Sequence, residues 1–244
     1  MAILDSLRAE LAPTGTLRAG INYGNPVLAR RDPRSGELSG IAVVLARELA
    51  RRAELPLKLV GYESAGKMFA AFKQGAWDIA FLALDAERAN EIDFTAPYLE
   101  IEGAYLVPAG SPLRAPADVD RDGTRIAVSA GSAYDLFLTR SLKHAVLVRA
   151  PTPDAAFALA VAREVDAVAG VRQHLLDNAP KLPGSRVLDG RFMAIEQALG
   201  LPKGRPQARD YLCEFVEEMK ACGLIARAIE EAGLRGVTVA PKAR

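Results

Sequence analysis

The alternation of extended and helical segments in the first 84 residues is the feature that most limits the fold. Residues 16–21 alternate as a strand does, residues 41–53 carry apolar side chains at helical spacing, and residues 57–62 are again extended. A second helical stretch at 65–75 and a buried strand at 78–84 follow. Strands that are separated by helices usually pair in parallel, with helices on both faces of the sheet. The pattern predicts an α/β fold.

The same rhythm returns after residue 124, between two extended segments. Residues 125–140 predict a strand, a loop and the start of a helix, and 145–171 predict strand, helix and strand. Extended stretches near 103–110 and 190–200 bracket this middle unit, which is the pattern of two hinge strands. We therefore predict a discontinuous first lobe and an inserted second lobe, each a mainly parallel sheet flanked by helices. The predicted boundaries are 1–106 with 196–244 for lobe one, and 107–195 for lobe two.

Composition excludes several function classes. The chain has 31 basic and 30 acidic residues among 244, and this balance argues against nucleic acid as a partner. No apolar run approaches the roughly 20 residues that span a bilayer. Residues 1–15 contain charges where a secretory signal would be apolar, so either a signal has been removed or the protein is made without one.

Motifs for metals, nucleotides and disulfides are missing or incomplete. His144 and His174 have no companions at metal-ligand spacing, and the acidic run 118–123 resembles a calcium loop but reaches Ser129 where a glutamate is required. We expect two structural or surface histidines and a polar turn. There is no phosphate-binding glycine motif, and we expect no cofactor. Cys213 and Cys222 lie on one predicted helix, roughly 13 Å apart, so we expect packed thiols rather than a disulfide.

Three loops follow predicted strands, where open α/β sheets bind ligands. Ser132 and the neighbouring N–H of Ala133 open a helix, which suits an anion or is simply a helix cap. Arg88 follows the strand at 78–84 and either takes a carboxylate or pairs with a nearby acid on the surface. Tyr23 and Asn25 lie in a third loop, which closes over a ligand or merely forms a turn.

Several segments, in order and spacing, resemble the type 2 periplasmic solute-binding proteins of polar amino-acid ABC importers. They are SGELSGIAVVLARELARRAELPLKLV, FKQGAWDIAF, ERANEIDFTAPY, RIAVSAGSAYDLFL and LGLPKG, and the likeness covers roughly residues 14–235. The resemblance implies that Arg88 clamps the carboxylate of the ligand and that Ser132, with the N–H groups around it, is the partner from lobe two. It also implies that the loop with Tyr23 and Asn25 supplies a residue that stacks on the ligand.

Departures from the family pattern concern the ligand's ammonium group. Amino-acid binders of this kind usually carry an aspartate where this chain has Val171, followed by Arg172. Burying an ammonium without a counter-charge costs several kcal/mol, so the sequence favours a ligand with one or two carboxylates and no obligatory ammonium. Arg172 is either a second cation in the cleft or a surface arginine at a helix start. Glu196 is the residue that could replace the missing aspartate, which keeps amino acids open as ligands.

Two further pairs of polar residues are expected to look into the cleft. Glu63 and Ser64 follow the second predicted strand, and Glu196 and Gln197 lie on the second crossing. The predicted function is a solute-binding component that presents its closed form to an ABC permease, as a periplasmic monomer if the resemblance holds. An enzyme similar to the cyclohexadienyl dehydratases, with Glu196 as general acid, and a ligand-sensing domain are the alternatives. We predict no catalytic residues and no metal ligands.

Overall fold

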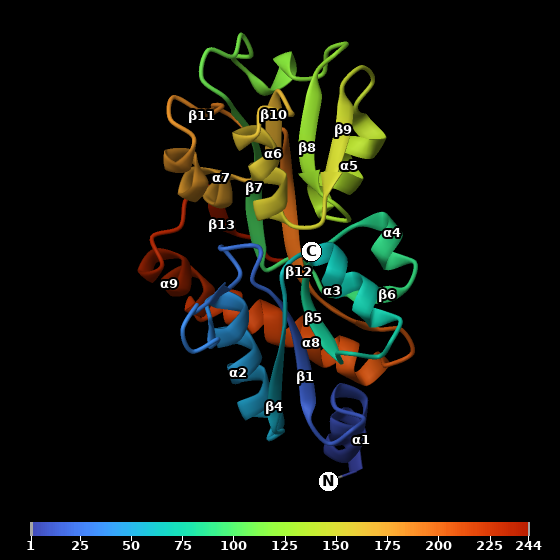
Figure 1. Ribbon diagram of the computed structural model, residues 1–244. Coiled ribbons are helices and arrows are strands. Elements are labelled where there is room, and N and C mark those ends of the chain that lie inside the picture. The colour runs from blue at the N-terminus through green and yellow to red at the C-terminus, as the bar shows by residue number, and fades with distance from the viewer. Residues whose placement is uncertain (1, 244) are drawn as a thin grey trace.

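One twisted sheet runs through both halves of the protein in the computed structural model, which describes residues 2–243 (Figure 1). Within that range the order of its main strands is β4-β1-β5-β12-β7-β10-β8-β9. In the lower half, β1 pairs in parallel with β4 and β5. The elements of this half are α1 (Ala2–Leu11), β1 (Leu17–Asn22), α2 (Ile41–Ala53), β4 (Leu57–Tyr62), α3 (Ala65–Phe72), β5 (Ile79–Ala83), α4 (Ala86–Ala89), β6 (Ile92–Phe94), α8 (Pro206–Ala221) and α9 (Leu224–Glu231), with a small β2–β3 hairpin (Arg30–Arg31 and Leu38–Ser39).

The upper half repeats this architecture. Strand β8 pairs in parallel with β9 and β10, and helices flank these strands (Figure 1). The elements are β8 (Arg125–Ser129), α5 (Ala133–Ser141), β9 (Val146–Ala150), α6 (Pro153–Val161), β10 (Ala167–Val171), α7 (Arg172–Asn178) and the short β11 (Arg186–Val187), with 3-10 turns at Pro116–Asp118 and Ala179–Lys181. The carboxyl ends of β8 and β10 and those of β1 and β5 therefore face one another between the two halves.

Two long strands connect the halves. Strands β7 (Leu99–Val107) and β12 (Met193–Pro202) pair in antiparallel fashion. Strand β13 (Val237–Val239) pairs with the first three residues of β7, also antiparallel. β12 also pairs with β5 below, while β7 pairs with β10 above. The two predicted crossings are thus present. The predicted boundary after residue 106 falls at the end of β7 and the one after 195 falls inside β12; the lobe limits themselves stay a prediction.

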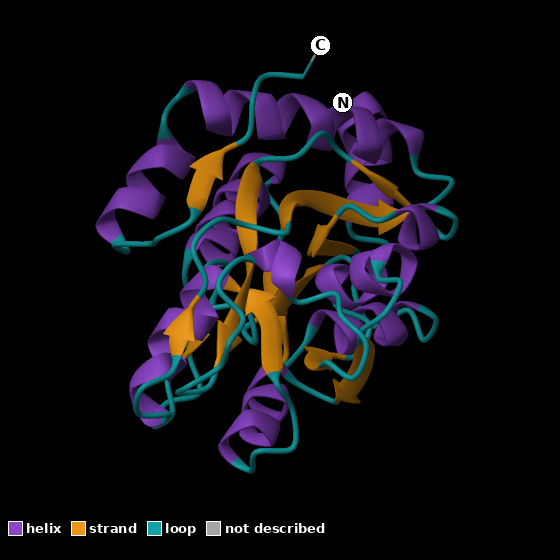
Figure 2. Cartoon of the chain, turned by 90° about the horizontal axis from the view of Figure 1, so that it is seen from above, coloured by secondary structure: helices purple, strands orange, loops and turns teal. Residues whose placement is uncertain are grey.

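Apolar positions at the expected spacing fill the cores of both halves. Helix α2 turns eight residues inward, including Ile41, Leu45 and Leu49, while its arginines face solvent. Trp77 is 1% exposed, and its indole N–H donates to the Met68 carbonyl at 2.9 Å, which fixes α3 against the sheet. Figure 2 shows helices lying on both sides of the central strands, as the sequence predicts.

The cysteine prediction is correct for one residue only. Both cysteines are free, and Cys213 is half-buried, but Cys222 is exposed because it caps the end of α8. Among the described helices, none is both long and apolar enough to cross a membrane.

Candidate functional site

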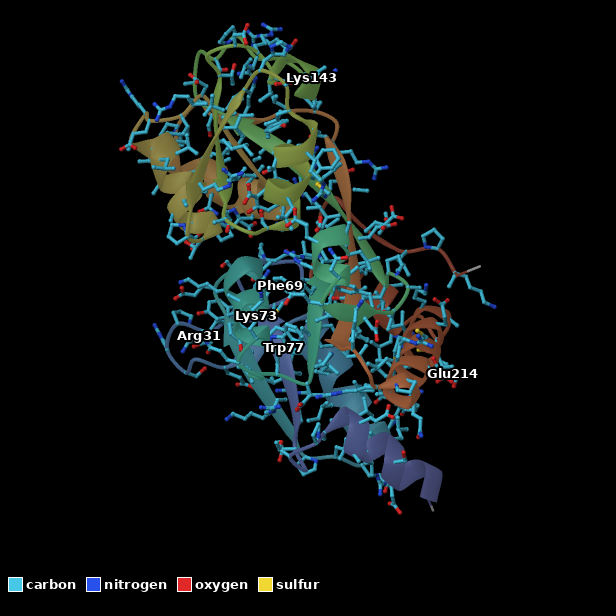
Figure 3. The ribbon with its side chains drawn as sticks, turned by 90° about the vertical axis from the view of Figure 1, so that its right-hand side faces the viewer. Arg31, Phe69, Lys73, Trp77, Lys143 and Glu214 are labelled. Carbon is cyan, nitrogen blue, oxygen red and sulfur yellow. The ribbon has the colours of Figure 1, made fainter. Side chains whose placement is uncertain are left out.

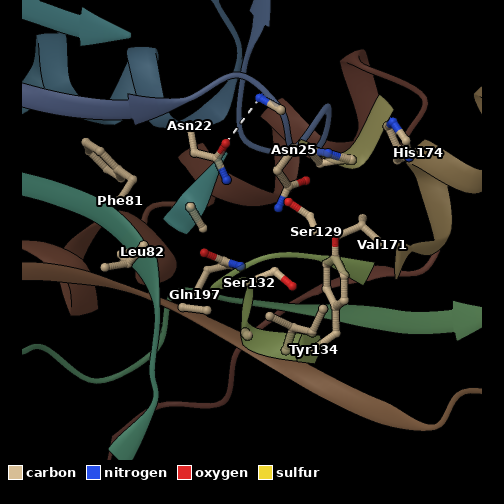
Figure 4. Close-up of a pocket in the computed structure, with 16 residues that line it drawn as sticks. Asn22, Asn25, Phe81, Leu82, Ser129, Ser132, Tyr134, Val171, His174 and Gln197 are labelled. Carbon is tan, nitrogen blue, oxygen red and sulfur yellow. Dashed lines mark hydrogen bonds between the residues drawn. The ribbon is translucent and has the colours of Figure 1, made fainter. Parts of the chain in front are cut away.

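A cavity between the two halves collects the loops at the carboxyl ends of the parallel strands (Figure 4). It holds about 500 Å³ of space, counting the part open to solvent. Neutral polar groups and apolar side chains line it: Asn22, Gly24, Asn25, Ala65, Phe81, Leu82, Ala83, Ser129, Ser132, Ala133, Tyr134, Pro153, Val171, His174, Ile195 and Gln197. None of these side chains is a carboxylate, and His174 is the one that can carry a positive charge.

The lower wall is formed by the loop after β1. The Asn22 side-chain oxygen accepts from the Gly24 N–H at 3.1 Å, and that of Asn25 accepts from the Val27 N–H at 3.1 Å. These bonds orient both amides, because the oxygens are held by the loop itself. Neither amide nitrogen donates to an acceptor within residues 2–243, so two N–H₂ groups remain available at the cavity.

The upper wall is the start of α5, and its donors differ in part from those predicted. Ser132 caps the helix by accepting from the Asp135 N–H at 3.1 Å. The Gly131 N–H donates to the Asp135 carboxylate and the Ser132 N–H donates to the Ser129 carbonyl, so these two are already engaged. The N–H groups of Ala133 and Tyr134 have no acceptor in the part of the chain that the structure describes. These two are the free donors of the helix N-terminus.

Tyr134 adds a neutral phenol to this wall. Burial raises the pKa of its hydroxyl to about 12, so the ring carries no charge at neutral pH. The Ser129 hydroxyl lies near it without forming a hydrogen bond of normal geometry. The cavity therefore presents hydroxyls and N–H groups rather than charges.

Arg88 lies beside the cavity and joins its two walls. The side chain is 1% exposed; Nη1 donates to the Ala83 carbonyl at 2.9 Å, and Nη2 donates across the cleft to the Gly131 carbonyl at 2.7 Å. Its Nε has no hydrogen-bond partner in residues 2–243, and the guanidinium carbon lies 5.9 Å from the centre of the Phe69 ring. Burial lowers the pKa of Arg88 to about 10, which still leaves the guanidinium charged at neutral pH.

No carboxylate of the described chain forms an ion pair with this guanidinium. The nearby Asp85 pairs instead with Arg140 from the upper half, at 2.8 Å. The alternative prediction, a surface arginine paired with Asp85 or Glu87, is therefore wrong, because the Arg88 side chain turns inward under α4.

Of the ten residues predicted to face the cleft, four line the cavity and six do not: Arg88 lies beside it, Ser64 is buried as the cap of α3, and the other four lie elsewhere. Asn25, Ser132, Ala133 and Gln197 are in the lining. Tyr23 and Glu63 lie at the outer mouth of the cleft, where Tyr23 is stacked by Arg31 and Glu63 pairs with Lys67. Arg172 and Glu196 are absent from the lining.

Both absences have a plain structural cause. Arg172 turns to Glu102 at 2.5 Å and to the carbonyls of Leu188 and Gly190, so it anchors the loop before β12. Glu196 faces solvent, because side chains alternate along β12 and its neighbour Gln197 takes the inward position. The prediction that Glu196 looks into the cleft is therefore wrong, and Arg172 fits neither of its two predicted roles, because it is mostly buried against Glu102 outside the cavity. Gln197 is 4% exposed and its Oε1 has no partner among residues 2–243.

His174 is the site residue that the sequence treats as structural. It is 8% exposed at the start of α7, and its Nε2 lies 2.9 Å from the Asp154 carboxylate. The acidic run 118–123, in contrast, is engaged with backbone: Asp120 accepts from the N–H groups of Lys143, His144 and Ala145, and Asp118 accepts from those of Arg114 and Ala115. No group of three or more potential ligands for a metal ion occurs within the described range.

The model of the bacterial extracellular solute-binding proteins, family 3, matches residues 17–232. The chain belongs to this family. No curated protein sequence matches it.

Solved structures share the fold. A mutant of ArgBP from T. maritima superposes with a TM-score of 0.78 at 20% identity, covering 95% of this chain and 99% of that one. The solute receptor for L-cysteine of Neisseria gonorrhoeae gives 0.79 at 22%, covering 93% and 92%. The ancestral amino acid-binding protein AncCDT-1, a precursor of cyclohexadienyl dehydratase, gives 0.77 at 22%, covering 93% and 98%. At these identities the likeness establishes the two-lobed fold, as predicted, and leaves the ligand to the site.

Proposed function

We propose that this solute-binding protein is the substrate-binding component of an ABC importer and closes its two lobes over a small carboxylate-bearing solute that needs no α-ammonium group. It acts outside the cytoplasmic membrane, as a monomer, and delivers the solute to a membrane permease. The family assignment supports the transport role. The ligand class rests on the chemistry of the cavity.

A buried guanidinium without a protein counter-ion is the observation that carries the ligand class. A charge that is removed from water is costly unless an opposite charge faces it. Nε and Nη2 of Arg88 form one edge of the guanidinium, and that edge suits the two oxygens of a carboxylate. Nε has no partner among residues 2–243, and Nη2 is held by a single carbonyl oxygen of the opposite lobe. A carboxylate at this edge supplies the missing charge.

The facing wall offers donors to the same group. The N–H groups of Ala133 and Tyr134 begin α5, and the helix dipole favours a negative charge there. Each lobe thus contributes donors to one carboxylate, so a bound anion stabilises the closed form over an open one. Differential binding of this kind shifts a hinge equilibrium.

The rest of the cavity disfavours an ammonium. Val171 occupies the place where the family pattern carries an aspartate, and it lines the cavity with 7% exposure. Glu196, the proposed replacement, faces solvent. An ammonium in this cavity meets amide and hydroxyl oxygens but no carboxylate. These contacts do not offset the free-energy cost of removing the ammonium from water.

The solvent-facing position of Glu196 also weakens the dehydratase alternative, because that alternative needs Glu196 in the cleft as the general acid. Any sensing role would use the same cavity, and the family assignment favours transport over it.

A thermal-shift comparison of matched solutes tests the proposal. Each 2-amino acid is compared with its 2-hydroxy and 2-keto analogues, using protein that has been unfolded, dialysed and refolded to remove bound solute. A solute at 100 times its Kd adds about 2.7 kcal/mol to the free energy of unfolding, which shifts the melting temperature measurably. We expect shifts from the acids without an amino group.

Two arginine variants provide the control. Arg88→Gln removes the charge at the cavity, and Arg172→Gln removes one that the structure places outside it. The shift should disappear in the first variant and persist in the second. A shift produced only by amino acids, or one that survives Arg88→Gln, contradicts the proposed ligand class.

A further inference from the structure

Two glycines meet where the lobes come closest. Gly66 lies in the first turn of α3 on the lower lobe, and Gly131 lies in the loop between β8 and α5 on the upper lobe. A Cβ added to Gly131 would stand 3.0 Å from the Gly66 Cα, and one added to Gly66 would stand 3.4 Å from the Gly131 Cα. The two backbones are therefore in direct contact, with no side chain between them.

The Gly66 side of this contact has no room for a methyl group. A Cβ at Gly66 would overlap the Ala130 carbonyl oxygen, which is backbone and belongs to the opposite lobe. Ala130 cannot withdraw easily, because its N–H donates to the Ala150 carbonyl at 2.8 Å and Gly131 is tied to Asp135. Separating the lobes relieves the overlap.

Nothing in α3 itself requires a glycine at this position. Gly66 has no positive φ, and Ser64, two residues before it, caps the helix by accepting from the Lys67 N–H. Alanine is the better helix former, because glycine loses more conformational freedom on folding. Gly131, in contrast, has a φ of +67°, so a substitution there would be strained for local reasons. A substitution at Gly66 therefore affects the contact between the lobes without straining the backbone of α3.

Several polar contacts also join the two lobes. Arg88 donates to the Gly131 carbonyl. One ion pair joins Arg30 to Asp177 at 3.0 Å and another joins Arg140 to Asp85 at 2.8 Å. The Arg30–Asp177 pair is exposed and contributes little, whereas the Asp85 side chain is nearly buried and Arg140 also reaches Glu87 at 3.8 Å.

We propose that Gly66 is a positioning residue: its backbone contact with Ala130 and Gly131 across the cleft sets how far the two lobes close. The inference rests on the proposed two-lobe closure but not on the identity of the solute. A methyl group at residue 66 holds the cleft partly open while leaving every cavity side chain unchanged.

The distance between the lobes is the direct readout. Two spin labels report this distance in a Cys213→Ser background. One is attached to the exposed Cys222 of the lower lobe, and the other to Lys143→Cys at the far end of the upper lobe (Figure 3). The pulsed electron-paramagnetic-resonance distance distribution is recorded on refolded, solute-free protein. Gly66→Ala is compared with Lys67→Ala, a neighbouring change in the same helix whose side chain pairs within its own lobe.

We expect the Gly66→Ala distribution to shift to longer distances by more than the width of the parent peak, with an unfolding temperature equal to or above that of the parent. Lys67→Ala should coincide with the parent. Coinciding distance distributions for Gly66→Ala and the parent overturn the proposal.

Arg140→Ala gives a second, independent test. The variant loses the ion pairs of Arg140 with Asp85 and Glu87, and it should shift the distribution less than Gly66→Ala does because the Arg140 side chain is about half exposed. A larger shift would assign closure to the ion pairs and overturn the role of Gly66. The thermal shifts with carboxylates are a separate measurement, so the ligand class can stand or fall independently.

Discussion

Replacing Val171 with aspartate should convert the cavity into one that accepts an α-ammonium group. Val171 lines the cavity and is the N-cap of α7, with no side-chain bond to the helix. An aspartate there places a carboxylate in the cavity and also caps α7, a contribution of about 1 kcal/mol that offsets part of the cost of burying the charge. The variant should therefore fold.

The size of the expected change follows from the buried ion pair. Leaving one partner of a buried pair alone costs about 3–5 kcal/mol, and each 1.4 kcal/mol is tenfold in affinity. The preference for a 2-amino acid over its 2-hydroxy analogue should rise by about 10²- to 4 × 10³-fold in Val171→Asp.

The matched control is Val171→Asn, which can cap the helix with a neutral group of the same shape. Isothermal titration with the 2-amino and 2-hydroxy acids gives the ratio of affinities in the parent and both variants. If Val171→Asp and Val171→Asn show the same ratio, the charge at this position does not select the ligand and the reasoning about the ammonium is refuted.

Two further predictions concern stability. Asp78 is fully buried and accepts from the backbone N–H, Nε and Nη2 of Arg18 at 3.0, 2.9 and 2.7 Å, so Asp78→Asn should lower the free energy of unfolding by about 3 kcal/mol; a loss below 1 kcal/mol in urea unfolding would contradict this. Hydrogen bonds from Arg51 and Arg52 lower the pKa of Glu48 to about 2, below its unfolded value, so its contribution is present above pH 4.5 and is lost as pH falls toward 2. Because Arg51 is largely exposed, Glu48→Gln should cost less than about 1 kcal/mol at pH 7 and nothing near pH 2, and an equal cost at both pH values would argue against the ion pairs.

Periodicity accounts for most of the fold that the sequence predicts. The helix at 41–53 and the strand at 57–62 have the predicted limits, because the helix turns one apolar face inward and the strand is a short, mostly apolar extended stretch. The crossings were also predictable, since β7 and β12 are long extended segments on either side of the second unit. Their pairing partners depend on how the chain folds back, which local spacing does not encode.

The site was predictable only in part. Asn25 and Ser132 follow from their positions in loops after strands. The choice between Glu196 and Gln197, which lie within β12, requires the phase of that strand, and its pairing with β5 and β7 sets this phase. Arg172 looked available because Glu102, seventy positions earlier, is distant in sequence. His174 reaches the cavity through the placement of α7, and no sequence signal marks it.

Titration of Arg88→Gln beside the parent protein tests the central claim most directly. The solute is the acid that gives the largest thermal shift, and the heat of binding is measured for both proteins at the same pH and salt. Losing the buried charge should weaken binding by at least about 100-fold, since about 3 kcal/mol or more depends on it, while cooperative unfolding is retained. A variant that unfolds cooperatively and binds the acid within threefold of the parent would show that Arg88 does not hold the carboxylate.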